Sequence, residues 1–348
     1  MGAALALGSR GRGRTAPNPP VGCVIVANGC VAGRGWTQPG GRPHAEAMAL
    51  RQAGAQSRGA TCYTTLEPCA HRSERGPTCS DLLIEAGIAR VVAALGDPDP
   101  RTDGDGFARL RAAGIVVTVG VRADEARASL AGFLTRRALG RPYVTLKLAT
   151  SLDGCIATGS GESRWITGPA SRAHAHLERS RHEAILVGRG TWEADAPALD
   201  VRLAGLEHWS PRRFVLTSAP LSRYQLDDWN RAERVRNGAS EAELTALWLG
   251  DTSFGSVTSP HAIADLPGID HLLIEGGART AAAFLAADLV DRLLLYRAPV
   301  IIGSGLPAIG DIGLTDLSAT HGRWRLHDAR GLGEDRLEVY ERTLCSPA

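Results

Sequence analysis

Apolar segments typical of strands alternate along the chain with amphipathic segments typical of helices. These segments fall into two successive blocks. In the first block, the apolar run Val21–Val26 predicts a buried strand, the turn signal Asn28-Gly29 follows, and Cys30–Trp36 predicts its hairpin partner. Further predicted strands lie at Ala60–Thr65, Arg90–Ala94 and Ile115–Val119, and predicted helices at Pro43–Ala53, Ser80–Ala86 and Phe107–Ala113. A hairpin followed by alternating strands and helices indicates a mixed sheet covered by helices.

The second block follows a long helix that is predicted over Ala123–Leu139 and that Gly140-Arg141-Pro142 would end. We therefore predict a first domain over residues 1–122, a connecting helix over 123–141 and a second domain over 142–348. The strands predicted in this block are Tyr143–Ala149, Ala184–Gly188, Phe214–Thr217, His271–Ile274, Arg292–Ala298 and Leu337–Arg342, and the helices are Pro169–Arg181 and Thr280–Ala287. The pattern from Leu221 to Pro267 is too weak to assign elements.

The composition narrows the class of protein. The chain has 348 residues, enough for two domains, and 44% of them are hydrophobic, which supplies a core for each. A formal net charge of +2 argues against a dedicated nucleic-acid binder, which would carry a strongly basic face. Apolar runs are too short to span a bilayer, and Met1–Leu7 lacks the basic region of a signal peptide. Seven thinly spread cysteines do not indicate a disulfide framework. We expect a cytoplasmic protein that binds neither nucleic acid nor membrane.

The motif His44-Ala45-Glu46, followed by Pro68-Cys69 and Cys79, carries the clearest chemistry. One imidazole and two thiolates can hold Zn²⁺ and leave its fourth position open for a water, whose pKa zinc lowers to roughly 7. Glu46 is not a ligand in this pattern but would move the protons of a hydrolytic deamination. We expect His44 and Glu46 in the first turn of one helix, and Cys69 at the start of a second helix that Pro68 opens.

A structural zinc site is the alternative to this interpretation. Such a site is closed by a fourth protein ligand, for which His71 is the nearest candidate in the sequence. We favour a catalytic site because Glu46 has no role in a structural one. His71 is then expected to contact the substrate or a group beside the metal ligands.

The second block carries weaker signals. Glu275-Gly276-Gly277 lies between a predicted strand and a predicted helix, where it fits a phosphate cradle or merely a tight turn. A second glycine-rich turn, Gly303-Ser304-Gly305, is a candidate for the same cleft. Asp153 follows a strand and either holds a substrate or caps a turn. Trp165 either belongs to the core or lies against a ligand.

Together these motifs resemble the bifunctional deaminase/reductase family of riboflavin biosynthesis over nearly the whole chain. In the first block the resemblance rests on residues 16–26 (APNPPVGCVIV), 43–46 (PHAE), 65–71 (TLEPCAH) and 96–100 (GDPDP). In the second block it rests on residues 146–154 (LKLATSLDG), 161–167 (GESRWIT) and 274–277 (IEGG). The implied fold class is α/β, with an N-terminal cytidine-deaminase-like three-layer α/β/α domain and a C-terminal dihydrofolate-reductase-like α/β domain.

The resemblance implies zinc-dependent deamination of 2,5-diamino-6-(5-phosphoribosylamino)pyrimidin-4-one, then NADPH-dependent reduction of its ribosyl group to ribityl. It implies that His44, Cys69 and Cys79 bind zinc, that Glu46 is the catalytic proton carrier, and that the protein is a homodimer. The residues that it implies at the substrate are Asn18, Ser163, Arg179, Leu199, Arg202 and Glu275. Those that it implies at NADPH are Ala149, Trp165, Thr191, Asp195, Ser218, Gly277, Ala278, Arg279, Thr280, Ala281, Ala282 and Ala283.

From the residues alone, Asn18 would also suit a turn between prolines, and Arg179 and Arg202 a solvated surface. The chain also departs from the family pattern. Nine residues separate Cys69 from Cys79, one more than we expect. The second departure is Cys155 and the third is Asp105, and at both positions the family usually has a basic residue. These two departures concern contacts to the substrate phosphate. The rival hypotheses are a nucleic-acid-editing deaminase, a zinc-stabilised binding module and an enzyme with an impaired reductase.

Overall fold

The structure, a computed structural model, describes residues 1–71, 76–218 and 254–343 and divides the chain into two compact units. Unit 1 comprises Met1–Pro142 with Gly268–Asp270, and unit 2 comprises Tyr143–Pro267 with His271–Ala348. Residues 72–75, in the loop that holds the extra residue between the two cysteines, lie outside the described residues. So do 221–253, which form most of the segment without predicted elements.

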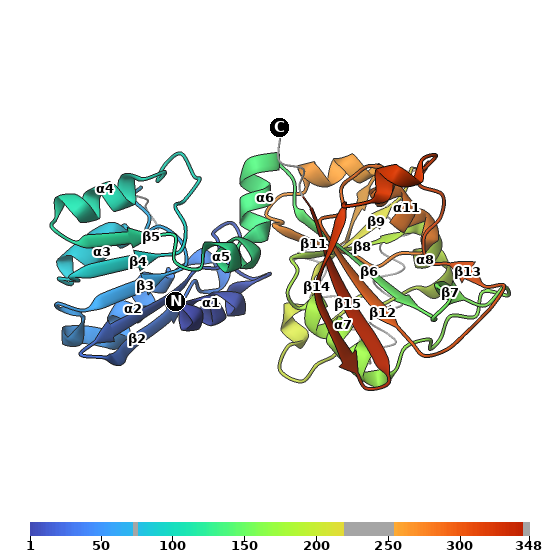
Figure 1. The fold of residues 1–348 in the computed structure, drawn as a ribbon, viewed down its shortest axis with the longest axis horizontal. Helices are drawn as coiled ribbons and strands as arrows, with labels where there is room; N and C mark the ends of the chain where they lie inside the picture. The colour runs from blue at the N-terminus through green and yellow to red at the C-terminus, as the bar shows by residue number, and fades with distance from the viewer. Residues whose placement is uncertain (72–75, 219–253, 344–348) are drawn as a thin grey trace, which may run out of the picture. The chain divides into compact units, whose positions relative to one another are not determined.

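The sheet of unit 1 has the strand order β2-β1-β3-β4-β5 (Figure 1). β1 is antiparallel to both of its neighbours, whereas β3, β4 and β5 run parallel. The strands are β1 (Gly22–Ala27), β2 (Cys30–Trp36), β3 (Thr61–Thr64), β4 (Arg90–Ala93) and β5 (Val116–Val119). Each lies within one residue of its predicted bounds, which confirms the mixed sheet.

Helices cover both faces of this sheet. α1 (Gly2–Gly8) packs so closely on β1 that a Cβ on Gly22 would lie 1.9 Å from one of its carbonyl oxygens. α2 (Ala45–Ala53) packs as closely on β2, where a Cβ on Gly35 would lie 2.1 Å from a carbonyl oxygen. Gly35 pairs with Cys23, the residue after Gly22, so the two glycines face opposite sides of the sheet. Unit 1 is therefore a three-layer α/β/α structure, as the resemblance implies.

The segment predicted as one long helix consists of two, α5 (Ala123–Ser129) and α6 (Ala131–Leu139). Between them Leu130 has φ −101° and ψ 12°, which interrupts the helix. Ala126, Leu130 and Phe133 are all buried in the hydrophobic core of unit 1. Their spacing is that of one continuous helical face, which is why the sequence pattern gave no sign of the break.

Unit 2 contains an eight-stranded sheet with the order β10-β9-β8-β11-β6-β12-β15-β14. The first six strands of this order run parallel, and β15 and β14 complete one edge in antiparallel pairs. Its strands are β6 (Tyr143–Thr150), β8 (Ala184–Gly188), β9 (Arg212–Leu216), β10 (Phe254–Val257), β11 (His271–Ile274), β12 (Arg292–Arg297), β14 (Trp324–Leu332) and β15 (Asp335–Arg342). The central strands β8 and β11 are buried throughout, as expected for a parallel sheet with both faces covered.

A small antiparallel pair, β7 (Cys155–Ala157) with β13 (Leu306–Pro307), lies beside this sheet in the chain's second unit. The remaining helices are α3 (Cys79–Glu85) and α4 (Asp105–Ala112) in unit 1, and α7 (Pro169–Arg179), α8 (Arg189–Asp195) and α11 (Ala278–Ala286) in unit 2. The sequence pattern missed α1, α8 and β14, as well as the short strands β7 and β13. The two helices have only seven residues each, and most side chains of the edge strand β14 are exposed, so neither kind of element shows a clear apolar period.

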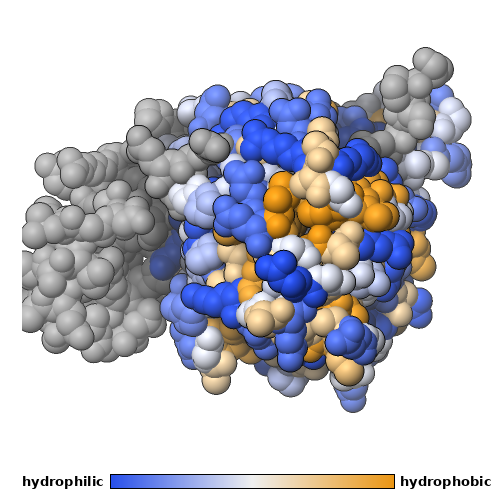
Figure 2. All heavy atoms as spheres, turned by 90° about the vertical axis from the view of Figure 1, so that its left-hand side faces the viewer, coloured by the Kyte–Doolittle hydropathy of each residue, from blue (hydrophilic) through white to orange (hydrophobic). Residues whose placement is uncertain are grey.

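No helix in the described part of the chain is long and apolar enough to cross a membrane. Figure 2 shows one face of the molecule, on which hydrophilic residues surround a smaller group of hydrophobic ones. The large hydrophobic side chains that unit 1 exposes include Val116 and Val119 of the edge strand β5. Scattered exposure of this kind is ordinary for a folded domain.

Candidate active sites

Three side chains that can bind a metal meet in unit 1. The ligand atoms of His44, Cys69 and Cys79 all lie within 4.8 Å of one another. His44 Nδ1 is 3.2 Å from the Cys79 sulfur and 3.5 Å from the Cys69 sulfur. Among the described residues the group has these three members, which is the number of protein ligands that a catalytic zinc site uses. His71 is outside the group, and its Nδ1 lies 3.4 Å from Thr102 Oγ1.

The three ligands come from two helix starts and one loop. His44 is the N-cap of α2, with Glu46 in the first turn, and Cys79 is the first residue of α3. The positive ends of these two helices favour a thiolate and a hydroxide beside them. Cys69 lies in the loop after β3, so the prediction that Pro68 opens a helix there is wrong. The second helix start is at Cys79 instead, because Thr78 caps it by accepting a hydrogen bond from the backbone N–H of Asp81.

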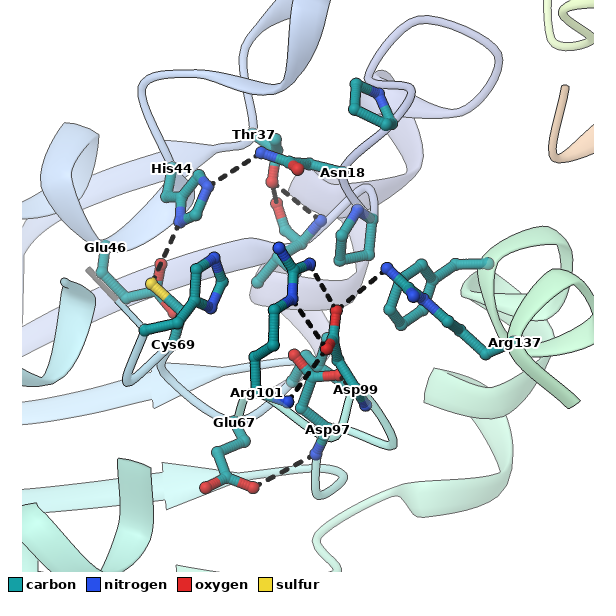
Figure 3. Close-up of a pocket in the computed structure, with 16 residues that line it drawn as sticks. Asn18, Thr37, His44, Glu46, Glu67, Cys69, Asp97, Asp99, Arg101 and Arg137 are labelled. Carbon is teal, nitrogen blue, oxygen red and sulfur yellow. Dashed lines mark hydrogen bonds and ion pairs between the residues drawn. The ribbon is translucent and has the colours of Figure 1, made fainter. Parts of the chain in front are cut away.

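Asn18 lies against the outer edge of the His44 imidazole. Its Nδ2 donates a hydrogen bond to the carbonyl oxygen of Gly41 at 2.7 Å and lies 3.0 Å from His44 Nε2 (Figure 3). This contact helps to hold the ring with Nδ1 toward the two sulfurs. Asn18 is therefore more than a turn residue, and it also lines the pocket in front of the metal ligands.

The sulfurs of Cys69 and Cys79 share a hydrogen bond that shifts their pKa values in opposite directions. A hydrogen bond from the Cys79 thiol outweighs burial and lowers the pKa of Cys69 to about 4, and His44 adds to the effect. The same contact, together with burial, raises the pKa of Cys79. The backbone N–H of Cys79 also donates to the Cys69 sulfur at 3.3 Å. Two soft sulfurs and one imidazole nitrogen, converging in this way, form a donor set that fits Zn²⁺.

Glu46 is positioned for proton transfer beside this group. Its side chain is 3% exposed, and it accepts a hydrogen bond from Thr64 Oγ1 at 3.1 Å. Burial raises the pKa of Glu46, which brings a carboxyl group closer to the range in which it can both take up and return a proton. Glu46 lines the same pocket as His44 and Cys69 (Figure 3).

The pocket also contains residues that the sequence analysis did not assign to it. Five of the predicted or considered residues line it, namely Asn18, His44, Glu46, Cys69 and His71. The additional polar residues are Thr37, Glu67, Asp97, Asp99, Arg101 and Arg137. The quoted motif of residues 96–100 contains two of these, but a single sequence gave no reason to turn their side chains toward the zinc ligands.

Unit 2 contains a cavity of about 1020 Å³, large enough for a dinucleotide and a substrate together. Most of the residues implied at NADPH line it, as do two of those implied at the substrate. The cavity residues from the two predicted sets are Ala149, Ser163, Thr191, Asp195, Ser218, Glu275, Gly277, Ala278, Arg279, Thr280 and Ala283. The first backbone N–H groups of α11 have no partner within the helix, and Ala278 and Arg279 bring them to the cavity wall. This wall fits a nucleotide phosphate.

The structure does not bring all of the predicted residues to this cavity. Leu199 is buried in the hydrophobic core, and Ala281 and Ala282 are buried in α11. Trp165 is 68% exposed, which excludes a core role, and the Arg172 guanidinium lies 4.8 Å from its ring centroid. The Arg202 side chain is exposed, and its Nε lies 3.4 Å from His176 Nε2.

Arg179 does not itself line the cavity but binds Glu275, which does. Arg179 Nε and Nη2 donate to the two carboxylate oxygens of Glu275 at 2.7 and 3.0 Å. Lys147 of β6, which sequence reasoning missed, also lines the cavity, and its Nζ lies 3.6 Å from Glu275. Burial alone would raise the pKa of Glu275, but Arg179 and Lys147 outweigh it and hold that pKa at about 2. The pattern carried a signal for Lys147, since a lysine within an otherwise apolar strand needs a partner.

Asp153 has a structural role in the turn after β6. Its carboxylate accepts hydrogen bonds from Ser151 Oγ at 2.5 Å and from the backbone N–H of Gly303 at 2.7 Å. The glycine-rich turn at residues 303–305 is thus tied to Asp153, and it is the following residues, Leu306 and Pro307, that line the cavity. Cys155 is buried behind this turn, with its sulfur 3.6 Å from the Gly303 carbonyl oxygen.

Comparisons with known proteins match both units. Residues 1–95 match the model of the cytidine and deoxycytidylate deaminase zinc-binding region, and residues 142–337 match that of the RibD C-terminal domain. The chain is 40% identical to the riboflavin biosynthesis protein RibD of Aquifex aeolicus, over 98% of this chain and 97% of that protein. It is 39% identical to RibD of Escherichia coli, over 96% of each.

Solved structures match over the full length as well. RibD of Acinetobacter baumannii superposes with a TM-score of 0.82 at 35% identity, covering 99% of this chain and 98% of that one. A Thermotoga maritima protein superposes with a TM-score of 0.81 at 32% identity, covering 99% of this chain and 97% of that one. Its name is diaminohydroxyphosphoribosylaminopyrimidine deaminase/5-amino-6-(5-phosphoribosylamino)uracil reductase.

Proposed function

Since the chain belongs to the RibD family of riboflavin biosynthesis proteins, it is a bifunctional deaminase and reductase that uses zinc and NADPH, and from this premise we propose the residues that act at each site. We assign deamination to the pocket of unit 1 and reduction to the cavity of unit 2. The substrate is the diaminopyrimidine ribosylamine phosphate that the name of the Thermotoga relative describes. The deaminase domain is residues 1–122 together with the segment 123–141, which packs in the core of unit 1, and the reductase domain is residues 142–348.

Deamination uses the residues around the metal ligands. Zinc held by His44, Cys69 and Cys79 would supply an activated water at the carbon that carries the amino group. The Glu46 carboxylate accepts a proton from that water, delivers it to the ring nitrogen, and then helps the amino group to leave as ammonia. Thr64 keeps the carboxylate in place through its hydrogen bond. Asn18 lies at the pocket wall, where it can hold the pyrimidine.

Reduction needs positioning more than acid–base chemistry. The amino sugar would open to an imine, and NADPH bound in the cavity would supply a hydride to the imine carbon, while the nitrogen takes up a proton from water. Glu275 stays ionised between Arg179 and Lys147 and presents a fixed acceptor to the sugar hydroxyls. The N-terminus of α11 and Thr191, which accepts the N–H of Gly277 at 3.2 Å, form the wall for the nucleotide phosphates.

The convergence of His44, Cys69 and Cys79 beside the buried Glu46 carries this proposal. The test is mass spectrometry of the products that the zinc-loaded protein forms from the diaminopyrimidine ribosylamine phosphate, with and without NADPH. We expect deamination in both reactions and reduction only with NADPH. Deamination alone would mean that the second site is impaired, as Cys155 allows. If no product forms, the assigned substrate is wrong.

Two further assignments complete the proposal. We place the enzyme in the cytoplasm and infer that it is a homodimer, as its family resemblance implies. Light scattering coupled to gel filtration measures the mass of the particle, and a monomer would contradict the second assignment. Gel-shift assays with tRNA address the rival nucleic-acid-editing function, for which we expect no binding at the low net charge of the chain.

A further inference from the structure

Two arginines from different segments of unit 1 converge in the deaminase pocket. Arg101 belongs to the loop after β4 and Arg137 to α6, and both line the pocket that contains His44 and Glu46. Figure 3 shows Asp99 between the two guanidinium groups, with Arg101 nearer to the metal ligands and Arg137 on the far side of the pocket. The pocket therefore has a metal-binding end and a basic end.

Asp99 fixes both guanidinium groups. Arg101 donates from Nε to Asp99 Oδ1 at 3.0 Å and from Nη2 to Oδ2 at 2.6 Å, and Arg137 Nη2 lies 2.9 Å from the same Oδ2. The Asp99 side chain is 6% exposed, whereas those of Arg101 and Arg137 are 60% and 37% exposed. The carboxylate is thus buried beneath the two cations, and the guanidinium faces that it does not use stay open to a ligand.

The two arginines are held in place before a ligand binds. The Arg137 guanidinium lies 5.4 Å from the ring centroid of Phe133, which also lines the pocket. A guanidinium restrained by an aromatic ring and a carboxylate loses less freedom when it binds an oxyanion.

Two acidic neighbours also line the pocket. Glu67 accepts three backbone N–H groups, from Asp97, Gly104 and Phe107, which offset its charge. Burial raises the pKa of Asp97 to about 6. An anion bound nearby would raise this pKa further, so Asp97 would take up a proton instead of repelling the anion.

We propose that Arg101 and Arg137, paired on Asp99, bind the phosphate monoester of the deaminase substrate. This inference rests on the proposed function, because it assumes a substrate with an aminopyrimidine at one end and a phosphate at the other. The ring must reach Glu46 and the metal ligands, which leaves the phosphate for the basic end of the pocket. Guanidinium groups suit a phosphate because they donate two parallel hydrogen bonds to its oxygens. Asp105, between two glycines where the family usually has a basic residue, is exposed and is not among the residues that line the pocket.

Deamination kinetics of Arg101→Gln and Arg137→Gln test this inference, with the phosphorylated substrate and its dephosphorylated counterpart. We expect each variant to raise KM for the phosphorylated substrate about 10- to 100-fold with little change in kcat, because the contact is equal in ground and transition states. With the dephosphorylated substrate each variant should raise KM far less, because no phosphate contact is removed. Arg90→Gln removes the same charge from an exposed position of β4 outside the pocket and is the matched control.

A structural role for the arginines predicts a different result. If they only hold the loop of Asp99, both substrates will lose activity to the same degree, and the inference is wrong. It is also wrong if neither KM moves. Thermal stabilisation by inorganic phosphate gives a readout without turnover, and the shift should shrink in the double variant R101Q/R137Q. If the wild-type chain fails to deaminate either substrate, the proposed function fails, while the phosphate-dependent shift still decides whether the arginines bind an oxyanion.

Discussion

Arg179 and Glu275 lie 96 residues apart in the sequence but meet in two parallel hydrogen bonds at the wall of the reductase cavity. Both side chains are largely buried, at 13% and 11% exposed, and Lys147 approaches the same carboxylate from β6. A buried ion pair of this geometry is costly to break, because the remaining partner is left as an unpaired charge. The ion pair therefore contributes to the stability of unit 2 and also holds Glu275 in place at the cavity wall.

The Glu275 carboxylate makes the stability of unit 2 depend on acid pH. Its pKa is lowered to about 2 from an ordinary value of 4.5, so its contribution is present above pH 4.5 and is lost as the pH falls toward 2. The shift corresponds to at most about 3 kcal/mol. Calorimetric unfolding between pH 7 and pH 3 measures this loss, and Glu275→Gln should flatten the pH dependence of the transition that belongs to unit 2. An unchanged slope in the variant would contradict the assignment.

Lys147 is expected to serve reduction and not deamination. Lys147→Met removes the second cation from Glu275 and should lower kcat/KM of the reductase about 10- to 100-fold, since the carboxylate would be less firmly placed for the sugar. Deamination by the same variant is the internal control and should be unchanged, because Lys147 lies in unit 2. Lys147→Arg keeps the charge and should recover part of the lost activity. Equal reductase rates for the methionine variant and the wild type would exclude a positioning role.

Glu46→Gln separates proton transfer from metal binding. The amide keeps the size of the side chain but cannot carry the proton, so deamination should fall by about 100- to 10,000-fold. Zinc content, measured by atomic absorption, should stay equal to that of the wild type because Glu46 is not among the three grouped ligands. A zinc-stabilised binding module would show no functional change in this variant, which makes it a test between that rival and the enzyme.

Removal of zinc should affect only one of the two activities. A chelator is expected to abolish deamination, while reduction of a substrate that is already deaminated should persist, because the metal ligands belong to unit 1 and the NADPH cavity to unit 2. Cys79→Ser should reproduce the loss, since a serine hydroxyl is a poor replacement for a thiolate ligand. Added Zn²⁺ should restore the chelated wild type and not the serine variant. Parallel loss of both activities would argue against independent sites.

Much of this protein follows from its sequence. The strands of unit 1 lie within one residue of their predicted bounds because each is a short apolar run that a turn or helix signal delimits. The convergence of His44, Cys69 and Cys79 was predicted because a few residue types at fixed spacing specify zinc chemistry, and the structure brings these three side chains together. The sequence did not reveal that the long predicted helix is divided at Leu130 or that Cys69 lies in a loop. Neither feature changes the pattern of apolar and polar residues along the chain.

Tertiary structure decided what lies opposite those residues in each pocket. Arg137 meets Asp99, and Arg179 meets Glu275, only after helices and loops pack against two separate sheets. A charged residue in a single sequence looks the same whether it faces solvent or a buried partner, because its charge carries no information on direction. The sequence by itself therefore determined the fold class and the three side chains that converge as a group able to bind a metal. The packing of distant segments decided which arginines and lysines line the two pockets, because that depends on distances that no local pattern encodes.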